Sequence, residues 1–318
     1  MAEIRTSTLH TTPVGEDGEP VVFLHGLFGR GKNFTRIAKD LQPDFRSLLV
    51  DLPNHGGSAW TDRVDYEQMA DSVAETLRDD FAAAGPVAVV GHSLGGKVAM
   101  VLALRHPDLV SRLVVVDIAP ARAGGGEGEF AHLLDSLAAV DLSALERRSD
   151  ADEALRGPIP WDTTRSFLLQ NLRRGPEGLS WEPNLELLRS SLDTIGGFPD
   201  TGDAVYEGPV LWVAGGRSDY VRDEHAPVMR RLFPRAHRVT IREAGHWVHS
   251  QEPEKFVEAS PIDQVHGDAP PFLVIHGDRD SLAPVSDARV FLRACPVRGA
   301  CGRFVFDTRA RVNAIFEG

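Results

Sequence analysis

The chain has 318 residues, 42% of them hydrophobic and 25% charged, and Lys+Arg 34 against Asp+Glu 46 give a formal net charge of −12 at pH 7. This composition is typical of globular proteins and excludes wholesale disorder and collagen-like or coiled-coil architectures. The acidic balance argues against nucleic acid or an anionic membrane surface as the main partner. Because the sequence has neither an apolar run of about 18 residues nor a typical signal peptide, we expect no membrane insertion and a cytoplasmic location.

Short apolar runs rich in β-branched residues recur along the chain, with segments of helical pattern between them. Runs that are apolar at every position are typical of parallel strands buried on both faces of a sheet. The predicted strands are residues 21–24, 48–50, 87–90, 113–116 and 210–213, with a weaker one near 238–241. Amphipathic helices are predicted at 34–41 and 69–81, the second with Asp65 as its N-cap. The sequence therefore predicts an α/β fold with a mostly parallel central sheet flanked by helices.

A glycine-rich stretch, Gly124-Gly-Gly-Glu-Gly128, opens a segment of roughly 70 residues with helical pattern and no clear strand, which ends near Pro199. A crossover between two strands rarely needs this length, so we predict a helical cap over the strand ends. The expected domains are a core of residues 1–121 and 205–260, a cap of residues 122–204, and an atypical C-terminal extension of residues 261–318.

The motif Gly91-His-Ser-Leu-Gly95 lies directly between a predicted strand and the helical run Lys97–Arg105. In this context G-x-S-x-G places the serine on a sharp strand-to-helix turn, where the helix N-terminus favours a nearby anion. Ser93 is therefore the candidate nucleophile.

Two backbone amides are the expected oxyanion donors. His25-Gly-Leu-Phe-Gly29 follows the first predicted strand, where this architecture places one donor, and the residue after the nucleophile supplies the other. This nominates the amides of Leu27 and Leu94, while the side chain of His25 is expected to brace the loop.

The candidate base and acid follow downstream of the serine. Ala244-Gly-His-Trp247 comes after the last predicted strand, so His246 is the candidate general base, whereas His249 is expected at the surface or facing the cap. Asp117 ends one strand and Asp219 follows the next, and both remain candidates for the acid. Either carboxylate would fix the tautomer of the histidine and stabilise the imidazolium.

Five motifs in register give the sequence a family resemblance over about residues 10–260. They are His25-Gly-Leu-Phe-Gly29, Asp51-Leu-Pro-Asn-His-Gly-Gly-Ser58, Gly91-His-Ser-Leu-Gly-Gly-Lys97, Val116-Asp-Ile-Ala-Pro120 and Ala244-Gly-His-Trp-Val-His249. Together they resemble the YbfF-type esterases of the α/β-hydrolase superfamily. The resemblance implies Asp117 as the preferred acid and Ser218 as a supporting residue, with Asp219 still open as the fold-level alternative.

These motifs predict a serine hydrolase that cleaves carboxylic esters, with short to medium acyl chains favoured, through an acyl-enzyme. An acyl-CoA thioesterase is the alternative; a cofactor-free haloperoxidase, a C–C hydrolase and a non-catalytic binding module are less favoured. Phe28 and Trp247, with cap residues such as Trp161 and Phe167, indicate an apolar acyl pocket, and aromatic packing in the core is an equal interpretation. The expected partner is a small-molecule ester, and we expect no cofactor and no metal because the histidines lack H-E-x-x-H spacing.

The C-terminal extension carries a second strand-plus-acid pattern, Pro271-Phe-Leu-Val-Ile-His-Gly-Asp-Arg-Asp280. It resembles part of the hormone-sensitive-lipase-like esterases, yet no histidine follows His276 and no second G-x-S-x-G exists. We expect a fragment of another hydrolase in which Asp280 is catalytically silent. The alternative is a native extension that completes the core after Pro261 stops the preceding helix.

Overall fold

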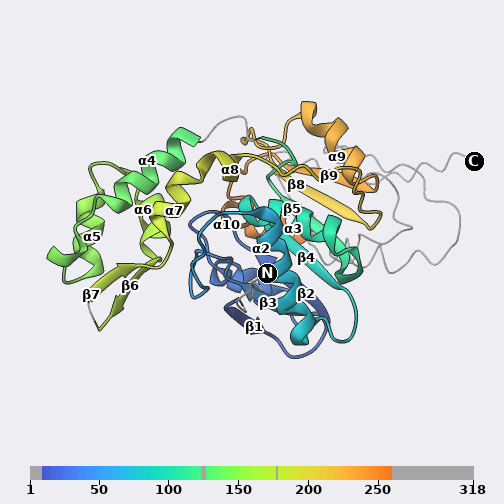
Figure 1. Cartoon of the computed structure of the whole chain (residues 1–318), viewed down its shortest axis with the longest axis horizontal. Coiled ribbons are helices and arrows are strands. Elements are labelled where there is room, and N and C mark those ends of the chain that lie inside the picture. Colours follow the sequence, from blue (N-terminus) through green and yellow to red (C-terminus); the bar gives the residue numbers. More distant parts are fainter. Residues whose placement is uncertain (1–8, 123–126, 177, 260–318) are drawn as a thin grey trace, which may run out of the picture. The chain divides into compact units, whose positions relative to one another are not determined.

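The computed structural model describes residues 9–122, 127–176 and 178–259. Seven strands form one sheet in the order β1-β3-β2-β4-β5-β8-β9 (Figure 1). β1 pairs antiparallel with β3, and the other neighbours pair in parallel. The strands are β1 (Thr11–Val14), β2 (Glu19–Leu24), β3 (Phe45–Val50), β4 (Val87–His92), β5 (Val110–Val116), β8 (Val210–Gly215) and β9 (Ala236–Ile241). The predicted α/β fold with a mostly parallel sheet is confirmed.

Helices cover both faces of this sheet because its strands are apolar on both sides. One apolar cluster joins the sheet to α2 (Tyr66–Thr76), α3 (Leu94–Arg105) and α9 (Ala226–Leu232). The other joins it to α1 (Thr35–Asp40), α10 (Val248–Gln251) and α11 (Pro253–Ala259). Asp65 caps α2 as predicted, since its carboxylate accepts from the amides of Glu67 and Gln68 at 3.0 Å.

The segment between β5 and β8 is named the insert here, for its described residues 127–176 and 178–204. It contains α4 (Glu127–Ala138), α5 (Arg148–Leu155), α6 (Asp162–Leu169), β6 (Leu172–Gly175), β7 (Gly178–Trp181), α7 (Leu185–Ser190) and α8 (Leu192–Gly196). The expectation of helices without a strand is wrong here, because β6 and β7 pair as an antiparallel hairpin. The turn residues Gly175, Pro176 and Gly178 were the sequence signal for it.

The predicted cap boundaries at 122 and 204 stay predictions, as does the role of the insert as a cap. Its C-terminal end is tied to the core by Lys97 of α3, which is buried and donates to the carbonyls of Ile195, Gly196 and Gly197 at 2.5–3.1 Å. These carbonyls lie at the C-terminus of α8, where a cation is favoured by the helix dipole. The end of the insert is thereby held on the helix that follows the candidate nucleophile.

Strand β1 was not predicted. It is a short edge strand that contains Pro13, and a sheet edge tolerates a residue without an N–H. In the described part of the chain, no helix is long and apolar enough to cross a membrane. The expectations for residues 261–318, including a silent Asp280 and the hormone-sensitive-lipase-like fragment, lie outside the described residues and stay predictions.

Candidate active site

The candidate site lies at the carboxyl ends of the central parallel strands. Ser93 follows β4, Asp117 follows β5, and His246 follows β9. Because neighbouring parallel strands end at the same edge of a sheet, residues far apart in sequence meet there. This edge is also where open α/β sheets bind their ligands.

Ser93 sits on a strained turn between β4 and α3. Its φ of 52° and ψ of −117° lie outside the ordinary regions for a side-chain-bearing residue. The flanking glycines are required by close packing, since a Cβ on Gly91 would lie 2.3 Å from the carbonyl oxygen of Gly95 and one on Gly95 would lie 2.4 Å from that of Leu24. The amide of Ser93 donates to the carbonyl of Val116 at 3.1 Å, which fixes the turn on the neighbouring strand.

A continuous chain of hydrogen bonds joins the serine to a buried carboxylate. Ser93 Oγ lies 3.0 Å from His246 Nε2, and His246 Nδ1 lies 2.8 Å from Asp117 Oδ2. With the ring proton on Nδ1, the imidazole donates to Asp117 and leaves Nε2 able to accept from the serine hydroxyl. This arrangement can take a proton from Ser93 and stabilise the imidazolium that results.

Asp117 is the carboxylate that the structure places beside His246. Its side chain is fully buried, its Oδ1 accepts from the amide of Gly215 at 2.8 Å, and Ser218 Oγ donates to Oδ2. Asp219 is exposed, and among the described residues it forms no hydrogen bond with the imidazole. The sequence could not separate the two aspartates because they follow adjacent strands.

The predicted oxyanion loop forms a tight turn against the nucleophile. The turn comprises residues 26–29, and the amide of Gly29 donates to the carbonyl of Gly26 at 2.9 Å. Its third residue, Phe28, has a φ of 61°, whereas its second residue, Leu27, has no positive φ. This is a type II turn, and its third position normally takes glycine or asparagine because a Cβ there costs about 1–2 kcal/mol. A Cβ on Gly26 would lie 3.2 Å from the Cβ of Ser93, so the turn is in contact with the nucleophile.

Both predicted oxyanion donors have N–H groups available. Among the described residues, the amide of Leu27 has no hydrogen-bond partner. Leu94 is the first residue of α3, so its amide has no partner in the helix's own series of hydrogen bonds. His25 braces the loop as expected, because its Nδ1 donates to the carbonyl of Gly26 at 2.8 Å and its Nε2 accepts from the amide of Leu52 at 2.9 Å.

Four other histidines near the site are buried and neutral. Burial lowers the pKa of His25 to about 4 and those of His55 and His249 to about 3, and it lowers the pKa of His92 well below its usual value. His246 is therefore not surrounded by other imidazolium cations at neutral pH.

The expected exposed or cap-facing position of His249 is wrong. Its ring is buried, with centroids 4.6 Å from those of His92 and Phe34. Helix α10 begins at Val248, two residues after His246, and this short helix carries the His249 ring inward against His92, the residue before Ser93.

Two residues around His246 were missed by the sequence reasoning. His92 Nε2 donates to the backbone carbonyl of His246 at 2.8 Å, so the variable residue of the G-x-S-x-G motif holds the histidine loop. Tyr220 stacks on the imidazole with ring centroids 4.1 Å apart and an interplanar angle of 26°. No local sequence pattern predicts either contact, because each contact joins segments that follow different strands.

The aromatic residues expected to line a pocket divide between the core and the site. Phe28 is buried, with its ring centroid 6.2 Å from that of Phe130 on α4. Trp247 is half-buried and lies beside both His246, at 5.9 Å between centroids, and Phe167 of α6, at 6.2 Å. Both residues thus connect the site to the insert, and their role in substrate binding stays a prediction.

A parallel sheet with a strained serine after one strand and a histidine after the last is the arrangement of an α/β hydrolase. The profile of the alpha/beta hydrolase fold family matches residues 19–253, and the chain belongs to this family. The predicted membership of the α/β-hydrolase superfamily is confirmed.

Its relatives identify it further as an α/β hydrolase of the esterase and lipase type. The chain is 40% identical to the "sn-1-specific diacylglycerol lipase ABHD11" of Mus musculus over 245 residues, which are 75% of this chain and 78% of the relative. It is 30% identical to "Esterase YbfF" of Escherichia coli over 243 residues, 76% of this chain and 92% of that one. A solved structure titled "Marine microorganism esterase" superposes with a TM-score of 0.75 at 34% identity, covering 79% of this chain and 97% of that one.

Proposed function

We propose that the chain is a serine carboxylesterase in which Ser93 is the nucleophile, His246 the general base and Asp117 the acid. The observation that carries this proposal is the hydrogen-bond chain from Ser93 through His246 to Asp117, at 3.0 and 2.8 Å, on a strained strand-to-helix turn. The similarity to an esterase of Escherichia coli and to the solved structure of a marine microorganism esterase supports it.

In this mechanism, Ser93 Oγ attacks the ester carbonyl while its proton passes to His246 Nε2. The negative charge on the carbonyl oxygen is accepted by the amides of Leu27 and Leu94, and one such donor is worth about 3 kcal/mol in comparable sites. The tetrahedral intermediate collapses as the alcohol leaves with the proton from His246. Water, activated by the same histidine, then hydrolyses the acyl-enzyme.

Asp117 and Ser218 serve the histidine in this scheme. The carboxylate holds the Nδ1–H tautomer and stabilises the imidazolium, while the hydroxyl of Ser218 and the amide of Gly215 keep the carboxylate oriented. The proposed substrates are small-molecule carboxylic esters, with short to medium acyl chains favoured.

The name of the mouse relative favours a second substrate class, the sn-1 ester of diacylglycerol. Acyl-CoA thioesters undergo the same acyl chemistry at a serine and are the remaining alternative. All three classes place their acyl group on Ser93, so one panel of substrates separates them.

The test is hydrolysis of p-nitrophenyl acetate, butyrate, octanoate and palmitate, of a diacylglycerol, and of acetyl- and palmitoyl-CoA. We expect turnover of the esters, a burst of p-nitrophenol equal to the enzyme concentration, and a loss of about 10³-fold or more in Ser93→Ala. Ser149→Ala, which alters an exposed serine on α5, is the matched control and is expected to be fully active.

A folded Ser93→Ala variant that keeps more than a few per cent of the turnover contradicts the proposal. Higher kcat/KM for the CoA thioesters than for every oxygen ester assigns the chain to the thioesterase alternative instead.

A further inference from the structure

The turn that carries the Leu27 amide is held by the insert, and not by the sheet alone. The carbonyl of Phe28, the residue with the strained positive φ, accepts from Asn171 Nδ2 at 2.7 Å. Asn171 is fully buried and lies between α6 and β6. Its Nδ2 also donates to the carbonyl of Leu168 at 3.2 Å, so both neighbours are acceptors and the amide nitrogen must face them.

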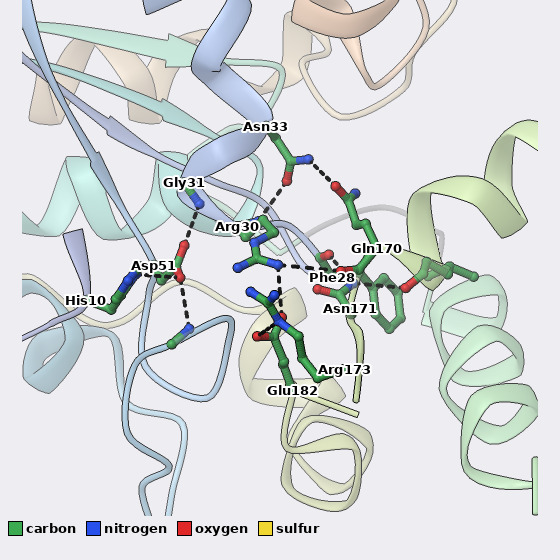
Figure 2. A network of polar contacts seen from close by, with 12 residues as sticks. His10, Phe28, Arg30, Gly31, Asn33, Asp51, Gln170, Asn171, Arg173 and Glu182 are labelled. Carbon is green, nitrogen blue, oxygen red and sulfur yellow. Dashed lines mark hydrogen bonds and ion pairs between the residues drawn. The ribbon is translucent and has the colours of Figure 1, made fainter. Parts of the chain in front are cut away.

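Further polar contacts join Arg30 and Asn33, which follow this turn, to residues on either side of the β6–β7 hairpin (Figure 2). Arg30 Nη1 pairs with Glu182 Oε2 at 3.0 Å, and Asn33 Nδ2 donates to Gln170 Oε1 at 2.8 Å. The side chains of Arg30 and Glu182 are 8% and 12% exposed, so this ion pair is shielded from water. The amide of Glu182 donates in turn to the carbonyl of Asn171 at 3.0 Å, which ties the ion pair to the asparagine.

These contacts act on a turn whose own sequence does not favour its shape. A phenylalanine at the third position of a type II turn favours other conformations, and they would rotate the peptide units around Leu27. The hydrogen bond from Asn171 opposes that rotation because it requires the Phe28 carbonyl to point at the insert. An oxyanion donor is effective only when its N–H is already aimed at the developing charge.

We propose that Asn171 is a positioning residue for the oxyanion hole, and that the insert thereby sets the direction of the Leu27 N–H. The inference rests on the proposed function, because it concerns the transition state of the reaction at Ser93. Asn171 acts through Phe28 and touches neither the ester nor Ser93. Its loss therefore weakens transition-state binding more than substrate binding, so kcat falls and KM stays nearly constant.

The experiment compares Asn171→Leu with Tyr66→Phe. Leucine has the same branched arrangement of heavy atoms as asparagine and removes its N–H donor. The matched control removes another buried hydrogen bond between the core and the insert, from Tyr66 Oη to the carbonyl of Ile195 at 2.8 Å, which does not touch the oxyanion turn. We expect Asn171→Leu to lower kcat for p-nitrophenyl butyrate about 10-fold or more with KM within about 2-fold, and Tyr66→Phe to stay within about 2-fold in both.

The Ki of a trifluoromethyl ketone separates the two possible roles of Asn171. It depends on the oxyanion hole, and it should not change if Asn171 only attaches the insert to the core. Ser93 Oγ adds to the carbonyl carbon of the ketone, the serine proton passes to His246, and the ketone oxygen becomes an oxyanion. We expect its Ki to rise with the loss of kcat in Asn171→Leu. The Ki of the matching trifluoromethyl alcohol, which cannot form this adduct, should change less than about 2-fold.

Three outcomes overturn the inference. A folded Asn171→Leu variant with wild-type kcat contradicts it, and so does an equal loss of kcat in Tyr66→Phe. If Asn171→Leu does not fold, Glu182→Gln decides, because it replaces the carboxylate that pairs with Arg30 and Arg173 in the same network. A 2- to 5-fold lower kcat is expected, and a wild-type kcat overturns the inference. A wild-type protein that hydrolyses no ester contradicts the proposed function itself, whereas the other outcomes leave that function standing.

Discussion

Two parts of the candidate site are held in different ways: the serine side, with Ser93 and Asp117, and the oxyanion side, with the turn of Leu27 and Phe28. Ser93 and Asp117 are fixed by backbone hydrogen bonds to neighbouring strands, to the carbonyls of Val116 and Val213 at 3.1 and 2.9 Å. The turn of Leu27 and Phe28 is fixed in part by a side chain 143 residues away. The first arrangement follows from the sheet itself, whereas the second depends on which side chains the insert presents.

The largest effect is expected when each of the two candidate acids is replaced by asparagine in turn, which tests the serine side. Asp117→Asn keeps the shape but replaces the acceptor of the His246 proton, which favours the wrong tautomer, so we expect kcat to fall about 10³- to 10⁴-fold. Asp219→Asn alters an exposed residue and should change kcat less than about 2-fold. Steady-state kinetics on p-nitrophenyl butyrate checks both, and near-equal losses would mean that the site can use either acid.

The sequence predicted Ser93 and His246 because their signals are local, and it left the acid open between Asp117 and Asp219. Apolar runs mark the strands, glycines mark the strand-to-helix turn of Ser93, and the functional residues follow the order of the strand ends along the chain. The inward position of His249 and the hydrogen bond from Asn171 to Phe28 were not predicted, because each depends on which segments pack together, and neither periodicity nor a motif encodes that pairing. The β6–β7 hairpin was also missed, although its turn residues Gly175, Pro176 and Gly178 were a local signal.

Neutral, buried histidines lie near both the serine and the oxyanion turn, and we expect acid to lower the free energy of unfolding of the chain. The pKa values of His25, His55, His92 and His249 are lowered by burial in the folded chain, whereas an unfolded histidine titrates near 6.5. Between pH 6.5 and about 4 the unfolded state therefore binds more protons than the folded state. The free energy of unfolding is expected to fall by about 1.4 kcal/mol per pH unit for each histidine that is protonated on unfolding.

The variant His249→Phe tests the contribution of one histidine to this pH dependence. His249 packs against aromatic rings, and among the described residues its Nδ1 has no hydrogen-bond partner, so a phenyl ring can occupy the same apolar site without a proton to bind. We expect the slope of unfolding free energy against pH, from urea titrations at pH 4.5–6.5, to decrease by about 1.4 kcal/mol per pH unit. An unchanged slope would show that His249 is not neutral in the folded chain.

The smallest expected effect concerns Tyr220, which belongs to neither side and stacks on His246 from the loop after β8. During the proposed reaction the imidazole becomes a cation, and an aromatic face at this distance stabilises a cation by about 0.5–2 kcal/mol. Burial raises the pKa of the Tyr220 hydroxyl to about 12, so the phenol remains neutral and the ring face carries the interaction.

The ring can be tested separately from its hydroxyl. Tyr220→Phe keeps the aromatic face and should retain kcat within about 2-fold, whereas Tyr220→Leu removes it and should lower kcat about 3- to 10-fold. Melting temperatures measured in parallel exclude general unfolding as the cause. If leucine and phenylalanine give the same kcat, the ring only fills space beside His246. If phenylalanine gives the larger loss, the hydroxyl is the important group, and the stacking on His246 does not assist the reaction.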